Sequence, residues 1–202
     1  MRPSCTNRTV KGPAGVGHLF DVAFVCTGNR ARSPLAEALF RRSTAGLEVQ
    51  VASFGTLGIE GAPGLPDAIR AARRLDIDLS GHRATRLHDG CLRSCDLVLG
   101  FEWDHVAAAV MEGGASPART FLLGEFAMLI IDSPLEPDRR YARARTIVAL
   151  ADSRRVRTRP DTTLSIEDPV GRPSRFMDMV VTEIDRLVEV TSHLLFSPRP
   201  LP

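Results

Sequence analysis

The sequence contains little that would indicate a secreted, membrane-bound or nucleic-acid-binding protein. Four cysteines in 202 residues are too few for a disulfide scaffold, and no signal peptide precedes the first apolar segment. No apolar run approaches the length of a membrane span. The formal net charge of +2 gives no electrostatic reason to expect nucleic acid or a membrane surface as a partner. We therefore expect a protein of the reducing cytosol.

The common signatures for nucleotides and metals are also missing. Neither Gly-x-x-x-x-Gly-Lys-[Ser/Thr] nor Gly-x-Gly-x-x-Gly follows the first apolar segment, which excludes a standard nucleotide-binding loop. The histidines, cysteines and carboxylates form no cluster with the spacing of metal ligands. We expect the protein to need no metal and no other cofactor.

The chain has the length and composition of one globular domain. Its 44% hydrophobic and 25% charged residues are typical of a folded protein with a real core. Residues 1–17 contain Gly, Pro and basic residues, and we expect them to form a mobile tail before a single domain at 18–198. A segment rich in Arg, Pro and Asp at about 132–165 is predicted to be a basic surface insertion, a solvated excursion, with a lid or a partner-docking segment as the alternative. One short helix in it is indicated by Tyr141, Ala144, Val148 and Ala151.

Short apolar segments alternate with helical patterns along this domain. Four segments have the composition of buried strands: Leu19 to Val25, Val49 to Ser53, Asp96 to Phe101 and Arg119 to Leu123. Helices are predicted from Ser33, over 66–75, and near the C-terminus, where apolar residues recur at Met177, Val180, Ile184, Leu187, Thr191 and Leu194. The alternation predicts an α/β fold in three layers, with a four-stranded parallel sheet and helices on both faces. In such sheets a ligand binds beyond the carboxyl ends of the strands.

The stretch "VCTGNRARSP" places a cysteine at the end of the first strand. Ser33 is the expected N-cap of the following helix, with Pro34 at its first position. A loop that runs from a strand into a helix N-terminus directs backbone N–H groups toward a bound anion. Gly28 permits close backbone approach, and Asn29 tolerates the left-handed conformation that a tight loop needs. We therefore predict a phosphate-binding loop around Cys26.

Two side chains of this loop suit covalent phosphoryl transfer. The planar guanidinium of Arg32 can bind two phosphate oxygens at once. The same field favours the thiolate form of Cys26, which would attack phosphorus and form a cysteinyl-phosphate. Ser33 could donate its hydroxyl to the sulfur and help it leave later. No metal is needed for this chemistry.

A proton donor for the leaving oxygen is expected in "IEDPVG". Asp168 precedes Pro169, whose ring restricts the backbone before it and holds the aspartate on a stiff turn. As a general acid Asp168 would protonate the leaving alcohol, and as a general base it would then activate the hydrolytic water.

Five motifs resemble, in this order, those of the low-molecular-weight protein tyrosine phosphatases: "CTGNRARSP", "SFGT", "DIDLSGHRATRL", "DLVLGFEWDH" and "EDPVG". The resemblance covers roughly residues 20–195. It implies a metal-independent phosphatase with Cys26 as nucleophile and Asp168 as acid and base. Phosphate would be bound by Arg32 and by the backbone amides of the loop, formed by Thr27, Gly28, Asn29, Arg30, Ala31, Arg32 and Ser33.

The resemblance also implies supporting residues and shows departures. In the family a loop asparagine is held by a histidine, which corresponds here to Asn29 and His82, while the loop serine corresponds to Ser33. Many members have aromatic walls around a deep slot for a phosphotyrosine ring. Here Ile59 and Val170 stand at the wall positions, so a preference for aryl phosphates stays open.

Other positions of the motifs differ from the common pattern. Ala31 stands where many members have a second cysteine, which excludes protection of the nucleophile by a disulfide at that position. Thr85 occupies a position where arginine is common.

The resemblance implies that the substrate is phosphotyrosine in proteins. It also suggests a tyrosine kinase as a partner. The residues themselves support only a phosphate monoester. One alternative is a thioredoxin-coupled arsenate reductase, which needs two shuttle cysteines after the third strand, but Glu102 stands there while Cys91 and Cys95 precede that strand. Another is a phosphate-binding or phosphotyrosine-binding module without activity, which would not need Asp168.

Overall fold

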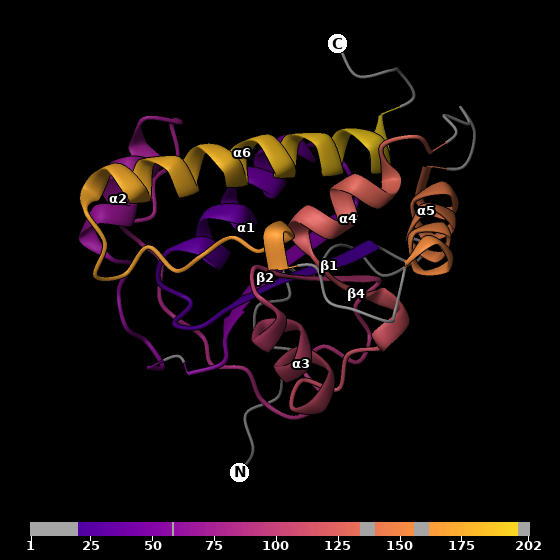
Figure 1. The fold of residues 1–202 in the computed structure, drawn as a ribbon, viewed down its shortest axis with the longest axis horizontal. Coiled ribbons are helices and arrows are strands. Elements are labelled where there is room, and N and C mark those ends of the chain that lie inside the picture. Colours follow the sequence, from indigo (N-terminus) through magenta and orange to yellow (C-terminus); the bar gives the residue numbers. More distant parts are fainter. Residues whose placement is uncertain (1–19, 58, 134–139, 156–161, 198–202) are drawn as a thin grey trace.

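A four-stranded parallel sheet lies between two layers of helices in the computed structural model (Figure 1). The structure describes residues 20–57, 59–133, 140–155 and 162–197. The tail expected at 1–17 lies outside these residues. None of the described helices is long and apolar enough to cross a membrane.

The strand order is β2-β1-β3-β4, and every pair is parallel. The strands are β1 (Phe20–Cys26), β2 (Val49–Gly55), β3 (Leu97–Gly100) and β4 (Thr120–Leu122). The chain passes from β1 to β2 on one side and later returns to β3 on the other, so the carboxyl end of β1 is the point where the direction of winding changes. In sheets of this kind, ligands bind beyond the strand ends at such a point. The predicted fold class is confirmed, and Cys26 ends the strand at the switch point.

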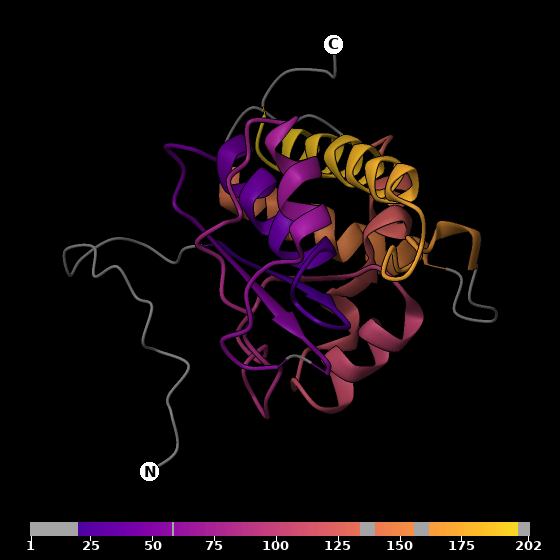
Figure 2. The ribbon, with the colours of Figure 1, turned by 90° about the vertical axis from the view of Figure 1, so that its left-hand side faces the viewer.

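Helices cover both faces of the sheet, as predicted (Figure 2). On one face lie α1 (Arg32–Ser43), α2 (Pro66–Arg73), α4 (Leu123–Ile130) and α6 (Ser174–Phe196), and α5 (Arg140–Arg154) packs at the edge of this layer. The other face carries α3 (Trp103–Met111). Two short 3-10 helices, Pro117–Arg119 and Thr162–Leu164, lie in the connections.

The two-residue period of β1 divides its side chains between two apolar clusters. Phe20, Val22 and Phe24 point to the larger cluster under α1 and α6, while Ala23 and Val25 point to the smaller one under α3. The Phe20 ring meets the ring of Phe196 edge to face at 5.4 Å between centroids. Six predicted apolar positions of α6 are buried in the larger cluster or beside it. Cys26 continues the even-numbered series, so its side chain lies on the α1 side of the sheet.

The start of α1 differs from the prediction. The helix begins at Arg32 with Ala31 as its N-cap, so Ser33 lies inside the first turn and is not the cap. Its hydroxyl faces Cys26 and takes no part in capping. The helix begins earlier than predicted because the loop winds directly into it. Pro34 is tolerated in the first turn, because an N–H there has no intrahelical acceptor.

The segment at 132–165 also differs from the prediction where it is described. The face of α5 formed by Ala144, Ile147, Val148 and Ala151 is buried in the main core. Arg143 donates to the Ser197 carbonyl oxygen at 2.6 Å. The prediction of a solvated excursion is therefore wrong for residues 140–155, because their arginines bind carbonyl oxygens of the domain and their apolar face packs.

Candidate active site

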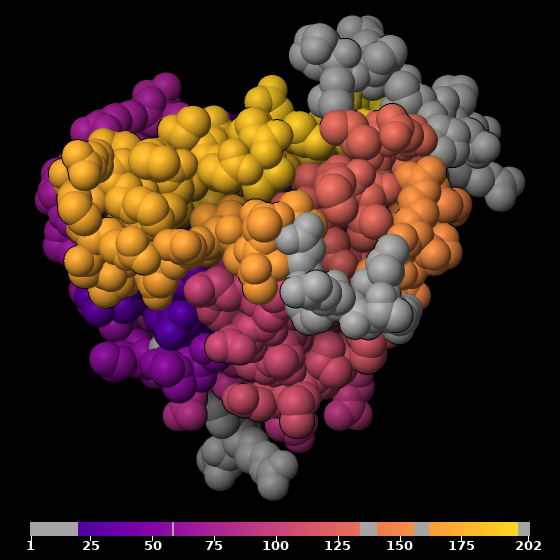
Figure 3. All heavy atoms as spheres, viewed as in Figure 1, coloured from indigo at the N-terminus to yellow at the C-terminus, as the bar shows by residue number. Residues whose placement is uncertain are grey.

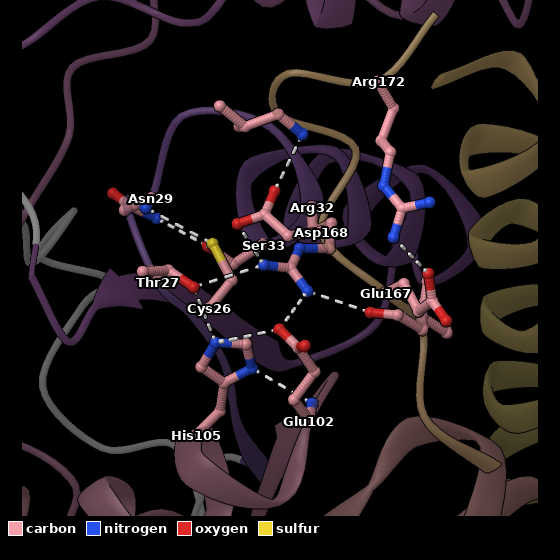
Figure 4. Close-up of polar contacts among 12 residues, drawn as sticks. Cys26, Thr27, Asn29, Arg32, Ser33, Glu102, His105, Glu167, Asp168 and Arg172 are labelled. Carbon is pink, nitrogen blue, oxygen red and sulfur yellow. Dashed lines mark hydrogen bonds and ion pairs between the residues drawn. The ribbon is translucent and has the colours of Figure 1, made fainter. Parts of the chain in front are cut away.

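The loop after β1 closes around the sulfur of Cys26, which is 3% exposed as a residue. The Asn29 N–H donates to Sγ at 3.3 Å, and the Ser33 hydroxyl lies 3.0 Å from Sγ (Figure 4). Both groups belong to the loop or to the first turn of α1. The thiol is therefore held by a backbone amide of the loop, beside a hydroxyl that can share a proton with it.

Asn29 adopts the left-handed conformation expected of it, with φ of 51°. Its Nδ2 donates to the Ser33 hydroxyl at 2.9 Å and to the Ser53 hydroxyl at 2.8 Å. Its Oδ1 accepts from the Thr85 N–H at 2.7 Å. His82 Nε2 lies 2.7 Å from the Asn29 carbonyl oxygen. Four contacts thus hold Asn29 in its left-handed conformation, and His82 makes one of them.

The end of β2 forms the floor beside this loop. A Cβ at Gly55 would lie 2.9 Å from the Asn29 nitrogen, closer than such atoms approach. The Leu57 N–H donates to the Thr27 carbonyl oxygen at 2.8 Å, and the Thr56 N–H donates to that of Cys26 at 2.9 Å. The glycine of the "SFGT" motif is therefore needed for close backbone approach.

Arg32 is buried and serves four acceptors with two nitrogens (Figure 4). Its Nη1 donates to Glu102 Oε2 at 2.6 Å and to the Ile166 carbonyl oxygen at 2.9 Å. Its Nη2 donates to Thr27 Oγ1 at 3.2 Å and lies 2.9 Å from Asp168 Oδ2. Each Nη carries two hydrogens, so Nε alone is left without a partner among the described residues.

The turn that carries Asp168 is anchored to the end of β3. The Ile166 N–H donates to the Phe101 carbonyl oxygen at 2.7 Å. Asp168 Oδ1 accepts the Val170 N–H at 3.1 Å, so the carboxylate also closes its own turn. The Asp168 side chain is 37% exposed, and its other oxygen faces Arg32. Residues about 140 positions apart in the chain thus meet at one edge of the sheet.

A family comparison agrees with this geometry. Residues 21–149 match the family of low molecular weight phosphotyrosine protein phosphatases. The chain belongs to this family. The match covers more than half of the chain and includes Cys26, Arg32 and Glu102.

Similar proteins are named as phosphatases. The probable low molecular weight protein-tyrosine-phosphatase EpsP of Ralstonia nicotianae is 34% identical over 113 residues, 56% of this chain and 77% of that protein. The protein-arginine-phosphatase of Bacillus subtilis is 35% identical over 108 residues, 52% of this chain and 71% of that protein.

Solved structures share the fold. The low molecular weight protein tyrosine phosphatase of T. tengcongensis has a TM-score of 0.63 and 25% identity, and the match covers 85% of this chain and 96% of that one. A Cys-to-Ser mutant of the YwlE arginine phosphatase, with its active-site serine phosphorylated, has a TM-score of 0.63 and 24% identity, and the match covers 86% of this chain and 93% of that one.

Glu102 and His105 join the phosphatase site although the sequence analysis did not assign them to it. The Glu102 N–H donates to His105 Nδ1 at 3.0 Å, so the neutral ring carries its proton on Nε2, which lies 3.0 Å from Thr27 Oγ1. Burial, aided by the charge of Arg32 and opposed by that of Asp168, lowers the pKa of His105 to about 4. The ring is therefore neutral at physiological pH.

A local signal for this pair was present in "FEWDH". An acidic residue directly after a buried strand, followed three positions later by a polar residue, has the spacing of a capping box. Glu102 is the N-cap of α3, and the two side chains complete that box. Together with its place at the carboxyl end of β3, this pattern could have marked Glu102 as a residue facing the loop.

The two expected wall residues lie at the surface. Ile59 is 70% exposed and Val170 is 61% exposed, and Leu57 beside the loop is 73% exposed. They lie on the two segments that flank the phosphate-binding loop, after β2 and after Asp168. Their role as walls of a substrate slot stays a prediction.

The remaining described cysteines belong to another part of the phosphatase. Cys91 and Cys95 pack beside the smaller apolar cluster under α3, on the face of the sheet opposite to Cys26. None of the three forms a disulfide. Burial raises the pKa of Cys95 to about 12, which makes it a poor nucleophile. Among the described residues, no group of histidines, cysteines or carboxylates could hold a metal ion.

Proposed function

We propose that this phosphatase hydrolyses protein phosphotyrosine, without a metal ion, through a cysteinyl-phosphate on Cys26. The observation that carries the proposal is the meeting of three groups at the carboxyl end of β1: the Cys26 sulfur, which accepts the Asn29 N–H, the buried Arg32, and Asp168 at 2.9 Å from Arg32. Each has the chemistry that one role in the reaction requires.

The first step transfers the phosphoryl group to the protein. The Cys26 thiolate attacks phosphorus, the sulfur–phosphorus bond forms, and the bond to the leaving oxygen breaks. Asp168 gives its proton to that oxygen, so the leaving group departs as a neutral alcohol or phenol. The loop amides and Arg32 bind the equatorial oxygens as their charge develops.

The second step returns the protein to its starting state. Asp168, now a carboxylate, takes a proton from a water molecule as that water attacks phosphorus. The phosphorus–sulfur bond breaks, and inorganic phosphate leaves. The Ser33 hydroxyl, 3.0 Å from Sγ, stabilises the departing thiolate by donating a hydrogen bond to it.

Phosphate binding also requires a rearrangement at Arg32. A guanidinium that binds two oxygens uses Nε and one Nη, but Nη2 already donates to Thr27 and forms an ion pair with Asp168. An arriving phosphate therefore replaces one of them. Asp168 is the more exposed acceptor and lies on a surface turn, so we infer that it is released toward the leaving oxygen.

Phosphoarginine in proteins is a second candidate substrate. Two observations favour it: the aliphatic residues Ile59 and Val170 at the expected walls, and the 35% identity to a protein-arginine-phosphatase. Arsenate reduction has less support, because Cys91 and Cys95 lie across the sheet from Cys26. A module that only binds phosphate would not need an acid beside Arg32.

The proposal places the protein in the reducing cytosol, where the thiol of Cys26 stays reduced. Its partner would be a phosphotyrosine protein, with a tyrosine kinase as the first one to examine.

The proposal is tested by the hydrolysis of an aryl phosphate, a phosphotyrosine peptide and a phosphoarginine peptide with a chelator present. Cys26→Ser should abolish turnover, and Asp168→Asn should lower kcat by about 100-fold or more. If only the phosphoarginine peptide is hydrolysed, phosphoarginine and not phosphotyrosine is the substrate. Unchanged turnover in Cys26→Ser would refute the thiol mechanism.

A further inference from the structure

Arg30 is a charged side chain of the phosphate-binding loop that the proposed reaction does not use. Its Nε donates to the Pro63 carbonyl oxygen at 2.7 Å, and its own carbonyl oxygen accepts the Leu65 N–H at 2.8 Å. Its Cγ lies 4.0 Å from the place where a Cβ of Gly28 would be, so the stem of the side chain runs alongside the loop. The guanidinium therefore sits on the edge of the loop that faces the segment 57–65.

The charge of Arg30 has no counter-charge among the described residues. Arg32 is offset by Glu102 and Asp168. Arg30 forms no ion pair with any described carboxylate, and of its five N–H groups only that of Nε has a described acceptor. The four N–H groups of the two Nη atoms are thus open to a ligand beside the phosphate-binding loop.

Two further arginines, Arg83 and Arg86, come from the segment that pairs with residues near this edge. Arg83 is bridged through its backbone to Pro63, the residue that accepts from Arg30, and Arg86 is bridged to Gly55. Both arginine side chains are exposed. The carboxylate of Glu60 lies next to Arg86 and accepts its backbone N–H at 2.7 Å. We call Arg30, Arg83 and Arg86 the basic edge.

We propose that Arg30 is a specificity-determining residue, which makes this phosphatase prefer phosphorylated residues flanked by aspartate or glutamate. The inference rests on the proposed function. The phosphate of a substrate is bound by Arg32 and the loop amides, so the ligand left for Arg30 is a second anionic group of the same substrate. A carboxylate one or two residues away in a phosphoprotein has that charge, and its two oxygens match the planar donors of a guanidinium.

The expected size of the preference follows from the exposure of the edge. An exposed ion pair of this kind changes binding by a factor of about two to five. The preference should also weaken as ionic strength rises, because salt screens charges at the surface.

The test compares three phosphotyrosine peptides that differ only in their flanking residues: acidic, amide and lysine. At low salt we expect kcat/KM to be highest for the acidic peptide, by about two- to fivefold over the amide peptide. In Arg30→Gln this ratio should fall close to one, and in Arg30→Lys it should largely persist. The ratio is taken within each variant, so any general loss of activity or of folded protein cancels.

The matched control is Arg73→Gln, which removes the same charge from the exposed C-terminal end of α2. The control should keep the wild-type ratio. An unchanged ratio in Arg30→Gln, or equal rates on all three peptides in the wild type, would overturn this inference and leave the proposed function standing. Hydrolysis of none of the peptides would instead refute phosphotyrosine as the substrate, and this inference with it.

Discussion

At the scale of single residues, Arg32 links binding to proton transfer. Its Nη1 is held by Glu102 and by the Ile166 carbonyl oxygen, while its Nη2 faces Thr27 and Asp168. The Nη1 contacts fix the plane of the guanidinium, and the Nη2 contacts lie where a phosphate can compete. The same side chain therefore keeps its orientation when it exchanges an acceptor.

Glu102 is a positioning residue in this account, because it acts through Arg32. Glu102→Ala removes the acceptor at 2.6 Å from Nη1, and we expect kcat/KM for an aryl phosphate to fall by about ten- to 100-fold, since small displacements of a binding group cost that much. Glu102→Gln keeps a carbonyl acceptor at the same place. It should stay within a few-fold of the wild type.

The control for Glu102 is Glu183→Ala on the exposed side of α6, where Glu183 pairs with the neighbouring Arg186. Steady-state kinetics on the four proteins decide the point. If the Gln variant is as inactive as the Ala variant, an acceptor oxygen at this position is not sufficient and the negative charge of Glu102 is required.

His105 makes the stability of the fold depend on pH. Its pKa is about 4 in the folded protein and 6.5 in the unfolded chain, so between these values the unfolded chain binds a proton that the folded protein does not. The free energy of unfolding should therefore fall as the pH is lowered through this range, by at most about 3 kcal/mol, and level off below it.

Urea unfolding of wild type and His105→Gln at a series of pH values measures this contribution. The variant can be less stable at every pH, but the difference between the two curves should shrink as the pH falls from 7 to 4. A difference that is constant with pH would contradict a neutral, buried His105.

At the scale of elements, the unit formed by β1, the loop and α1 carries most of the site, and it was the easiest part to predict. The apolar run that ends before Cys26 and the turn residues Gly28 and Asn29 locate the strand end and the loop without any tertiary information. The helices α3 and α4 were missed. α4 follows β4 without a connecting residue, so one continuous apolar run contains the end of a strand and a whole helix.

Long-range contacts set the limit of prediction at the site. Asp168 meets Arg32 because Ile166 binds the backbone of Phe101, a contact between segments that no local pattern connects. The acid could therefore be named from its motif, while its ion pair with Arg32 and the network through Glu102 needed the structure.

The close packing of β2 against the loop gives a prediction for Gly55. Gly55→Ala places a Cβ 2.9 Å from the Asn29 nitrogen, so the loop must shift. We expect the inhibition constant of inorganic phosphate to rise by about tenfold or more, with a smaller effect on overall stability.

Gly81→Ala is the matched control, because a Cβ there meets no atom within 4 Å. The inhibition constant of phosphate for each variant is measured by its competition with an aryl phosphate substrate. Equal constants for the two variants would contradict the role assigned to Gly55.

At the scale of the whole molecule, the part of the basic segment that forms α5 lies at the surface, next to α4 (Figure 3). Helix α5 lies beside α4 at the edge of the layer that covers the sheet. Its buried face joins the same apolar cluster as Phe20 and Phe196. The arginine-rich composition suggested a solvated helix because composition does not reveal which arginines reach carbonyl oxygens.

The contribution of α5 to stability can be measured with Ile147→Ala. Ile147 is 2% exposed, and its truncation should lower the free energy of unfolding by about 2 to 4 kcal/mol. The exposed Thr146→Ala should change it by less than about 1 kcal/mol. Equal stabilities in urea would show that α5 is peripheral to the domain.

The most direct test of the central claim is to stop the reaction with acid while an aryl phosphate is being hydrolysed, and to locate the phosphoryl group by mass spectrometry of the peptides. We predict phosphate on the sulfur of Cys26 and on no other residue, at a level that Asp168→Asn changes because the same carboxyl acts in formation and hydrolysis. Steady hydrolysis with no phosphate on Cys26 in either protein would contradict the covalent mechanism.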